Sequence, residues 1–160
     1  MDAVTETIQG VKMSAKTYLQ EIRKQQALIH ALEQKAEVIR ARAEGMKAIT
    51  YDRDKVQVSP ESRMEDLVVR LVEIEERIGA ELVKYHEALD VRLRQIRELS
   101  PDCAEILIQR YVMTGPKGEP LTWEQIAVNI ARSFSYVTHM HGVALQEFSR
   151  RFPKVCKHLQ

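Results

Sequence analysis

Apolar residues recur at alternating steps of four and three between residues 18 and 46, and charged or polar residues fill the positions between them. This spacing places the apolar side chains on one side of a helix, and a seven-residue repeat is typical of a helix that packs against one partner helix. Gln25 is the polar exception in this stripe. Its members are Tyr18, Ile22, Gln25, Ile29, Leu32, Ala36, Ile39, Ala43 and Met46.

A second stripe of this kind occupies residues 64–96, with a departure from the strict repeat after Ile78. The residues between the stripes, 45–62, are charged and turn-forming, so we expect a loop, with Ser59 and Pro60 as the cap and first position of the next helix. The chain then forms a long antiparallel coiled-coil helical hairpin. Because two helices bury little apolar surface, we expect the hairpin to form a homodimer or higher homo-oligomer. The second stripe comprises Met64, Leu67, Leu71, Ile74, Ile78, Leu82, Tyr85, Leu89, Leu93 and Ile96.

The apolar pattern becomes shorter after Ser100 and Pro101, which suit the cap and first position of a helix over residues 102–112. A loop rich in glycine and proline follows over residues 114–121. Thr122 can then cap a short helix, with Gln125 as its capping-box partner. The apolar side of that helix comprises Trp123, Ile126, Ala127 and Ile130.

A second short helix is predicted to begin after Ser133, because only a tight turn fits between it and the preceding helix. Pro153 stops or bends this helix. Two short helices joined by a tight turn are typical of a helix-turn-helix, which places its second helix in the major groove of DNA. The same spacing also occurs in ordinary helical corners that bind nothing. The apolar side of the second helix comprises Val137, Met140, His141, Ala144 and Leu145.

The composition supports an all-α chain. The apolar patterns divide this chain into a hairpin domain over residues 13–99 and a small helix-turn-helix domain over residues 100–152. Hydrophobic residues make up 44% and charged residues 29%, with only 6% aromatic residues and six glycines. The net charge of +1 excludes a strongly basic nucleic-acid coating protein, although basic residues are somewhat concentrated after Pro101, where protonated His139, His141 and His158 would add to them.

Several classes of protein are not expected. The two cysteines are too few and too far apart for a disulfide framework or a zinc site. The sequence shows no glycine-rich phosphate loop, no paired carboxylates in a plausible cleft and no nucleophile with a marked base, so we expect no enzyme, no cofactor and no metal site. It also has no signal peptide and no membrane-spanning run, which favours a cytoplasmic protein.

The segment W-E-x-I-A-x-x-I-x-x-S-x-x-x-V-x-x-M-H-x-x-A-L resembles region four of bacterial sigma factors and the related output domains of response regulators. With the long hairpin before it, the chain resembles phage- and prophage-encoded transcriptional regulators of Gram-positive bacteria, such as the ArpU-type regulators. The resemblance covers the chain from about Tyr18, but its specific residues follow Pro101. The matching positions are Trp123, Glu124, Ile126, Ala127, Ser133, Val137, Ala144 and Leu145.

This resemblance implies a transcription regulator that binds double-stranded DNA sequence-specifically, as a dimer, and that also contacts RNA polymerase. Two departures weaken the implied DNA binding. Ala131 stands where such motifs usually have glycine, and no Lys or Arg lies between Ser133 and Ser149. The alternative is a phage assembly or packaging protein, or a polymerase adaptor, in which the helices mediate protein contacts. The expected DNA-binding residues are Arg132, Ser133, Phe134, Ser135, Tyr136, Thr138, His139, Gly142, Arg150, Arg151 and Lys154.

Overall fold

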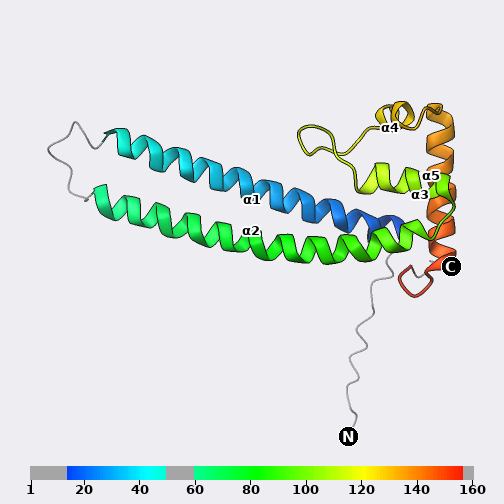
Figure 1. The fold of residues 1–160 in the computed structure, drawn as a ribbon, viewed down its shortest axis with the longest axis horizontal. Coiled ribbons are helices and arrows are strands. Elements are labelled where there is room, and N and C mark those ends of the chain that lie inside the picture. The colour runs from blue at the N-terminus through cyan, green and yellow to red at the C-terminus, as the bar shows by residue number, and fades with distance from the viewer. Residues whose placement is uncertain (1–13, 50–59, 157–160) are drawn as a thin grey trace, which may run out of the picture. The chain divides into compact units, whose positions relative to one another are not determined.

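The computed structural model describes residues 14–49 and 60–156, and it is helical throughout these ranges apart from turns and one isolated β-bridge between Thr114 and Pro120. The predicted all-α class is therefore confirmed. The helices are α1 (Ala15–Ile49), α2 (Pro60–Arg97), α3 (Pro101–Tyr111), α4 (Trp123–Asn129) and α5 (Phe134–Arg151), as Figure 1 shows.

The loop predicted over residues 45–62 is helical at both of its ends. α1 continues through Gly45 to Ile49, and α2 begins at Pro60, which is the predicted first position. Gly45 is exposed and costs the helix only about 1 kcal/mol relative to alanine, so a long helix can continue through it. Three parts of the predictions lie outside the described residues. They are residues 50–59 of the predicted loop, which include the cap residue Ser59, then Met13 at the start of the predicted hairpin domain, and His158.

The chain divides into two compact units. We call the first the C-terminal unit, which contains residues up to 21, residues 92–114 and residues from 120 onward. We call the second the long-helix unit, which contains residues 22–91 together with 115–119. The sequence pattern predicts a boundary between residues 99 and 100, whereas the contacts group the first turns of α1 and the last turns of α2 with α3, α4 and α5.

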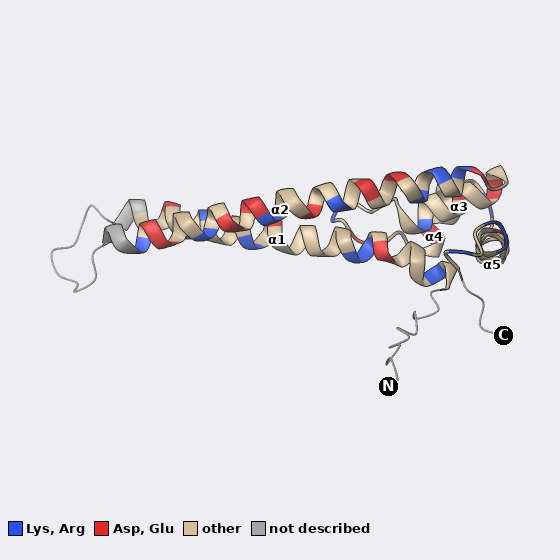
Figure 2. Cartoon of the chain, turned by 90° about the horizontal axis from the view of Figure 1, so that it is seen from below, with Lys and Arg blue, Asp and Glu red and all other residues tan. Residues whose placement is uncertain are grey.

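In the long-helix unit, α1 and α2 lie side by side in opposite directions (Figure 1). Gln26 Nε2 donates to the Tyr85 hydroxyl at 2.8 Å, and Arg40 pairs with Glu75 at 2.6 Å. An early residue of α1 therefore meets a late residue of α2, as antiparallel helices require. Figure 2 shows that both cations and acids occur along each of the two helices.

The two helices are buried to different degrees along this seam. On α1 the stripe is buried at Ile22, Ile29, Leu32, Ala36 and Ile39. On α2 the predicted seam residues from Met64 to Leu93 are only half-buried. Exposed valines also lie along α2, which leaves much of its apolar surface uncovered by α1. They are Val68, Val69, Val72, Val83 and Val91.

Gln25 lies in this seam, and its side-chain oxygen is buried without a hydrogen-bond partner in the described part of the chain. Replacing Gln25 by leucine is expected to raise the free energy of unfolding by about 1–2 kcal/mol, because a buried polar atom without a partner loses its hydration. Urea unfolding followed by far-UV circular dichroism measures the change. Gln34→Leu on the exposed side of α1 is the control, with an expected change below about 0.5 kcal/mol. Destabilisation by Gln25→Leu alone would contradict the prediction.

The core of the C-terminal unit brings together residues from four helices and the chain beyond α5. Phe148 of α5 is fully buried, with its ring centroid 6.0 Å from that of Tyr18 and 4.9 Å from that of Phe152. Both cysteines are buried here as free thiols. The first turns of α1 and the last turn of α2 thus complete the core around α3 and α5. Its buried residues are Ala15, Leu19, Ile96, Leu99, Cys103, Leu107, Tyr111, Ala144, Phe148 and Cys156.

A smaller apolar cluster holds α4 against α5. Ile126 and Val137 are fully buried, and Leu121 and Ala127 are nearly so, with Trp123 packed against them. These residues lie on the predicted apolar sides of the two short helices or next to them. The cluster fixes the direction in which α5 leaves the turn, and hence which side of α5 stays exposed.

Candidate nucleic-acid interface

Local hydrogen bonds define both ends of the connection between α4 and α5. The Thr122 hydroxyl accepts from Gln125 N at 3.2 Å, and Gln125 Oε1 accepts from Thr122 N at 2.8 Å, which completes the predicted capping box. The Ser133 hydroxyl accepts from Tyr136 N at 3.2 Å and caps α5. Both predicted caps are therefore present, because each depends only on residues three positions away.

Ala131 adopts a left-handed conformation, with φ of 53°, at the end of α4. Arg132 N donates to Ala127 O at 2.9 Å and Ala131 N donates to Val128 O at 3.2 Å. These two bonds form a Schellman motif, in which glycine is the usual residue at the left-handed position. The tight turn predicted between the helices is therefore made at the steric cost of an alanine side chain.

Ala131→Gly is expected to stabilise the C-terminal unit by roughly 0.5–1 kcal/mol. Removing the Cβ relieves the strain of the left-handed conformation, roughly 1–2 kcal/mol. Glycine also loses more backbone entropy on folding than alanine does, and this opposing term is somewhat smaller than the strain. The control is Ala127→Gly, the same change within helical α4, which should destabilise by about 1 kcal/mol. Urea unfolding followed by the fluorescence of Trp123, the single tryptophan, measures both. Equal losses for the two variants would contradict the strain at Ala131.

One side of α5 is exposed along its length, and we call it the α5 stripe. The stripe is defined by Ser135, His139, Gly142, Gln146 and Arg150, all exposed and spaced by four, three, four and four residues. That spacing keeps them on one side of an 18-residue helix, which is roughly 27 Å long. The stripe combines a hydroxyl, an imidazole, an amide and a guanidinium, and Gly142 leaves open space between them.

Gln146 was not among the predicted binding residues, although its amide has the donor and acceptor that match adenine in the major groove. The sequence contained a signal for it, since helical spacing from His139 and Gly142 leads directly to position 146. The predicted residues beyond Gly142 are the cations Arg150, Arg151 and Lys154, which suit phosphates, whereas Gln146 carries no charge.

Four predicted residues lie around the start of α5. Ser133 is the cap itself, and Phe134 is 48% exposed at the first helical position. Arg132 is exposed, and its guanidinium lies 5.3 Å from the centre of the Tyr136 ring. The Thr138 hydroxyl donates to Phe134 O and lies equally close to Ser135 O, 3.1 Å in each case. The Thr138 hydroxyl is therefore engaged with the helix backbone.

Other predicted residues are engaged within the C-terminal unit. The Tyr136 hydroxyl donates to Asp102 Oδ2 at 3.0 Å, and this hydrogen bond to a carboxylate raises the pKa of Tyr136. Arg151 pairs with Glu98 at 3.3 Å, on a side of α5 away from the stripe. Lys154 is exposed beyond the end of α5. The predicted set therefore divides into residues on the α5 stripe, residues beside its first turn and residues with partners inside the unit.

His141 does not add positive charge to this region, contrary to the expectation from its residue type. Its Nε2 lies 2.9 Å from the Tyr111 hydroxyl, and its ring packs edge-on against Trp123 at 4.8 Å. Burial lowers the pKa of His141 to about 4, and the nearby cations Arg110 and Lys16 contribute further to that shift. The imidazole is therefore neutral near pH 7 and acts as a packing residue, as its place on the predicted apolar side implies.

The start of α3 is held by α5 and not by its own cap residue. Ser100 occupies the predicted cap position, but its side chain makes no capping bond. Instead the Ser100 backbone N–H and hydroxyl both donate to the Glu147 carboxylate at 3.0 Å. The backbone bond is the main reason why the pKa of Glu147 is lowered. This contact fixes α3 to the middle of α5, on a side away from the α5 stripe.

A polar cavity of about 320 Å³ lies where α3, α4 and the start of α5 meet. Asp102 and Glu105 line it together with Arg132 and Asn129. Asn129 Nδ2 donates to Gln109 Oε1 at 3.0 Å, which ties α4 to α3. The carboxylates place negative charge beside Arg132, so this edge of the candidate interface carries both signs of charge.

Comparison of the chain with protein-family models, curated proteins and solved structures finds no match. Within residues 14–49 and 60–156, His, Cys, Asp and Glu form no group of three that could hold a metal ion. Among the described helices, none has the length and apolar character that crossing a membrane requires. The proposed function therefore depends on the geometry of the C-terminal unit.

Proposed function

We propose that the chain is a transcription regulator of the phage type that binds double-stranded DNA sequence-specifically in the cytoplasm, with α4 and α5 as its helix-turn-helix. The observation that carries the proposal is the exposed α5 stripe, on a helix that begins immediately after a tight turn and a serine cap. An α-helix fits the major groove of DNA, where Ser, His and Gln side chains can contact base edges. Arg132, Arg150 and Lys154 supply the contacts to the phosphate backbone of the DNA.

The long helices supply the second part of the proposal. α1 and α2 form an antiparallel coiled-coil hairpin that joins copies of the chain into a dimer or larger oligomer, which presents several recognition helices to one DNA site. The half-buried apolar seam of α2 supports association, because a second copy would cover surface that α1 leaves exposed. No step of this function requires a cofactor or a catalytic residue.

Selection of bound duplexes from a random DNA library, with the full chain at near-physiological salt, tests the proposal. Enrichment of one motif is expected. On that motif, His139→Ala combined with Gln146→Ala should weaken binding by about tenfold or more, because each base contact contributes about 1–3 kcal/mol. The control pairs the exposed His86→Ala of α2 with Gln34→Ala of α1, which should leave affinity unchanged. No enrichment by the folded protein would reject the function.

The dependence of binding on salt is expected to be shallow. Each phosphate contact adds about 0.9 to the slope of log affinity against log salt concentration. Three cations per copy, Arg132, Arg150 and Lys154, therefore predict a slope near 3 for each copy bound. A slope several times larger would mean that phosphate contacts from elsewhere in the chain dominate.

Binding to RNA polymerase or another protein is the second candidate function. It is favoured by Val128, which is 79% exposed on α4, and by the acidic residues Asp102 and Glu105, which line the polar cavity where α3, α4 and the start of α5 meet. Exposed apolar and acidic groups suit a protein partner better than a phosphate backbone. Val128→Ser together with Glu105→Ala should then impair activation of transcription and leave DNA affinity unchanged.

A further inference from the structure

The long-helix unit has one strongly basic side, which we call the basic face. Its cations are Lys35 and Arg42 of α1 and Arg63, Arg70 and Arg77 of α2, all exposed. Within each helix they recur every seven residues, so they stay on the same flank of the seam. They line two adjoining grooves of about 650 and 440 Å³, which share Arg42 and Arg70.

The basic face is only partly neutralised from within the long-helix unit. In an antiparallel pair this flank of α1 adjoins the corresponding flank of α2, so the cations of both helices gather along one groove. Asp66 and Glu73 are the acids that line the grooves. The ion pairs within the described part of the chain include none of the five cations. Like charges at this spacing destabilise a helix pair, and an anionic partner would reverse that effect.

The floor of the grooves is apolar. Ile39 is buried, Leu67 and Ile74 are half-buried, and Val38 is 51% exposed. Apolar side chains between rows of cations suit a helical surface that offers apolar residues between rows of acids. The occupant should therefore be helical and acidic, and not a small anion.

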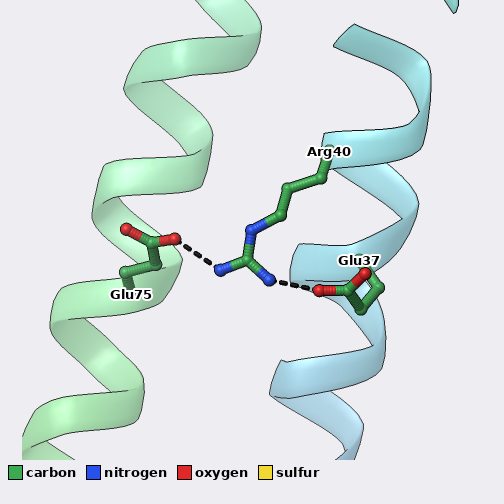
Figure 3. Close-up of polar contacts among 3 residues, drawn as sticks. All are labelled: Glu37, Arg40 and Glu75. Carbon is green, nitrogen blue, oxygen red and sulfur yellow. Dashed lines mark hydrogen bonds and ion pairs between the residues drawn. The ribbon is translucent and has the colours of Figure 1, made fainter. Parts of the chain in front are cut away.

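The opposite flank of the same two helices has the complementary composition, and we call it the acidic face. It carries Glu33, Glu37 and Glu44 of α1 and Glu65 and Glu75 of α2. Arg40 also lies on this face, between Glu37 and Glu75, and is bonded to both, as Figure 3 shows. A groove of about 340 Å³ lies on the acidic face, and Ala36 and Ile78 are among the residues that line it.

We propose that a second copy of the chain covers the basic face with its acidic face. The two faces are complementary in charge, and both offer apolar residues between the charged rows, including the half-exposed Val68 and Val72 next to the acids. The contact would also bury seam residues of α2 that α1 leaves half-exposed. Association of two identical faces about a two-fold axis would oppose like charges, so the contact is heterologous.

A heterologous contact leaves one basic and one acidic face free at the ends, so further copies add until a ring closes or a filament forms. This inference goes beyond the proposed DNA binding and does not depend on it. The assembly can therefore be measured without DNA.

The test changes each face separately in the full chain. Arg70→Glu with Arg77→Glu makes the net charge of the basic face negative, and Glu33→Lys with Glu44→Lys cancels the net charge of the acidic face while leaving the Arg40–Glu75 pair intact. Size-exclusion chromatography with light scattering at low salt should give assemblies for the wild type. Each variant should associate at least tenfold more weakly, and an equimolar mixture of the two should assemble again. Circular dichroism confirms that the helices are retained.

Glu76→Lys with Glu87→Lys is the matched control, because both are exposed on the side of α2 away from the seam. It should assemble as the wild type does. A wild type that stays monomeric, or face variants that assemble normally, would overturn the proposal. The proposal would also be overturned if Arg70→Glu with Arg77→Glu assembled normally but bound DNA more weakly. The basic face would then bind DNA and not a second copy of the chain.

Discussion

Phe148→Ala is expected to lower the free energy of unfolding of the C-terminal unit by about 3–5 kcal/mol. The Phe148 side chain is fully buried, and its ring lies against Tyr18 of α1 and Phe152 at the end of α5. Alanine would leave a cavity where three segments of the chain meet, and the surrounding residues cannot all move to fill it. Since single domains are stable by only about 5–15 kcal/mol, the variant should be close to unfolding.

Phe134→Ala is the matched control, because it removes the same side chain from the same helix at a position that is 48% exposed. Its expected effect on stability is about 0.5 kcal/mol or less. Urea unfolding followed by Trp123 fluorescence measures both variants. If Phe148→Ala cost no more than Phe134→Ala, Phe148 would not lie in the centre of the core.

The C-terminal unit is expected to lose about 1–2 kcal/mol of stability through His141 as the pH falls from about 6.5 to about 4. The pKa of His141 is lowered to about 4 in the folded chain, whereas an unfolded chain has the ordinary value of about 6.5. The unfolded state therefore binds the proton first, so stability is complete above pH 6.5 and falls below it. The full shift corresponds to about 3 kcal/mol, which solvent screening of the half-buried ring reduces.

His141→Gln isolates this effect, because glutamine can still bond to the Tyr111 hydroxyl but does not titrate. Urea unfolding at about pH 7 and about pH 4.5 should show a smaller loss of stability for the variant than for the wild type. Glu147 also has a lowered pKa and loses its bonds to Ser100 in acid, but it does so equally in both proteins. Equal losses in the two proteins would show that His141 is protonated without cost.

Features that depend on residues close in sequence were predicted correctly. The caps at Thr122 and Ser133 each need a partner three positions away, and the capping residues are of the types that form such bonds. The seam residues of α1 follow from helical spacing alone. Burial at Ile29 and Leu32 needs only that a partner helix exists.

Features that depend on distant residues were missed, because no local pattern encodes them. Leu19 is fully buried although it lies next to the predicted stripe, since it belongs to the core that the first turns of α1 share with α3 and α5. Ser100 has the position of a cap, but Glu147, far along the chain, takes both of its donors. Tyr136 was expected to face a groove, and its hydroxyl instead meets Asp102 of α3.

The ion pair that joins α1 to α2 favours one alignment of the two helices. If α2 slid by one heptad in either direction, Val68 or Leu82 would replace Glu75 opposite Arg40, and the guanidinium would lose its partner across the seam. An exposed pair such as this one adds little stability, about 0–1 kcal/mol. Its consequence lies in selection among competing alignments: the apolar stripes tolerate several, and the Arg40–Glu75 pair favours one of them, as does the Gln26–Tyr85 hydrogen bond.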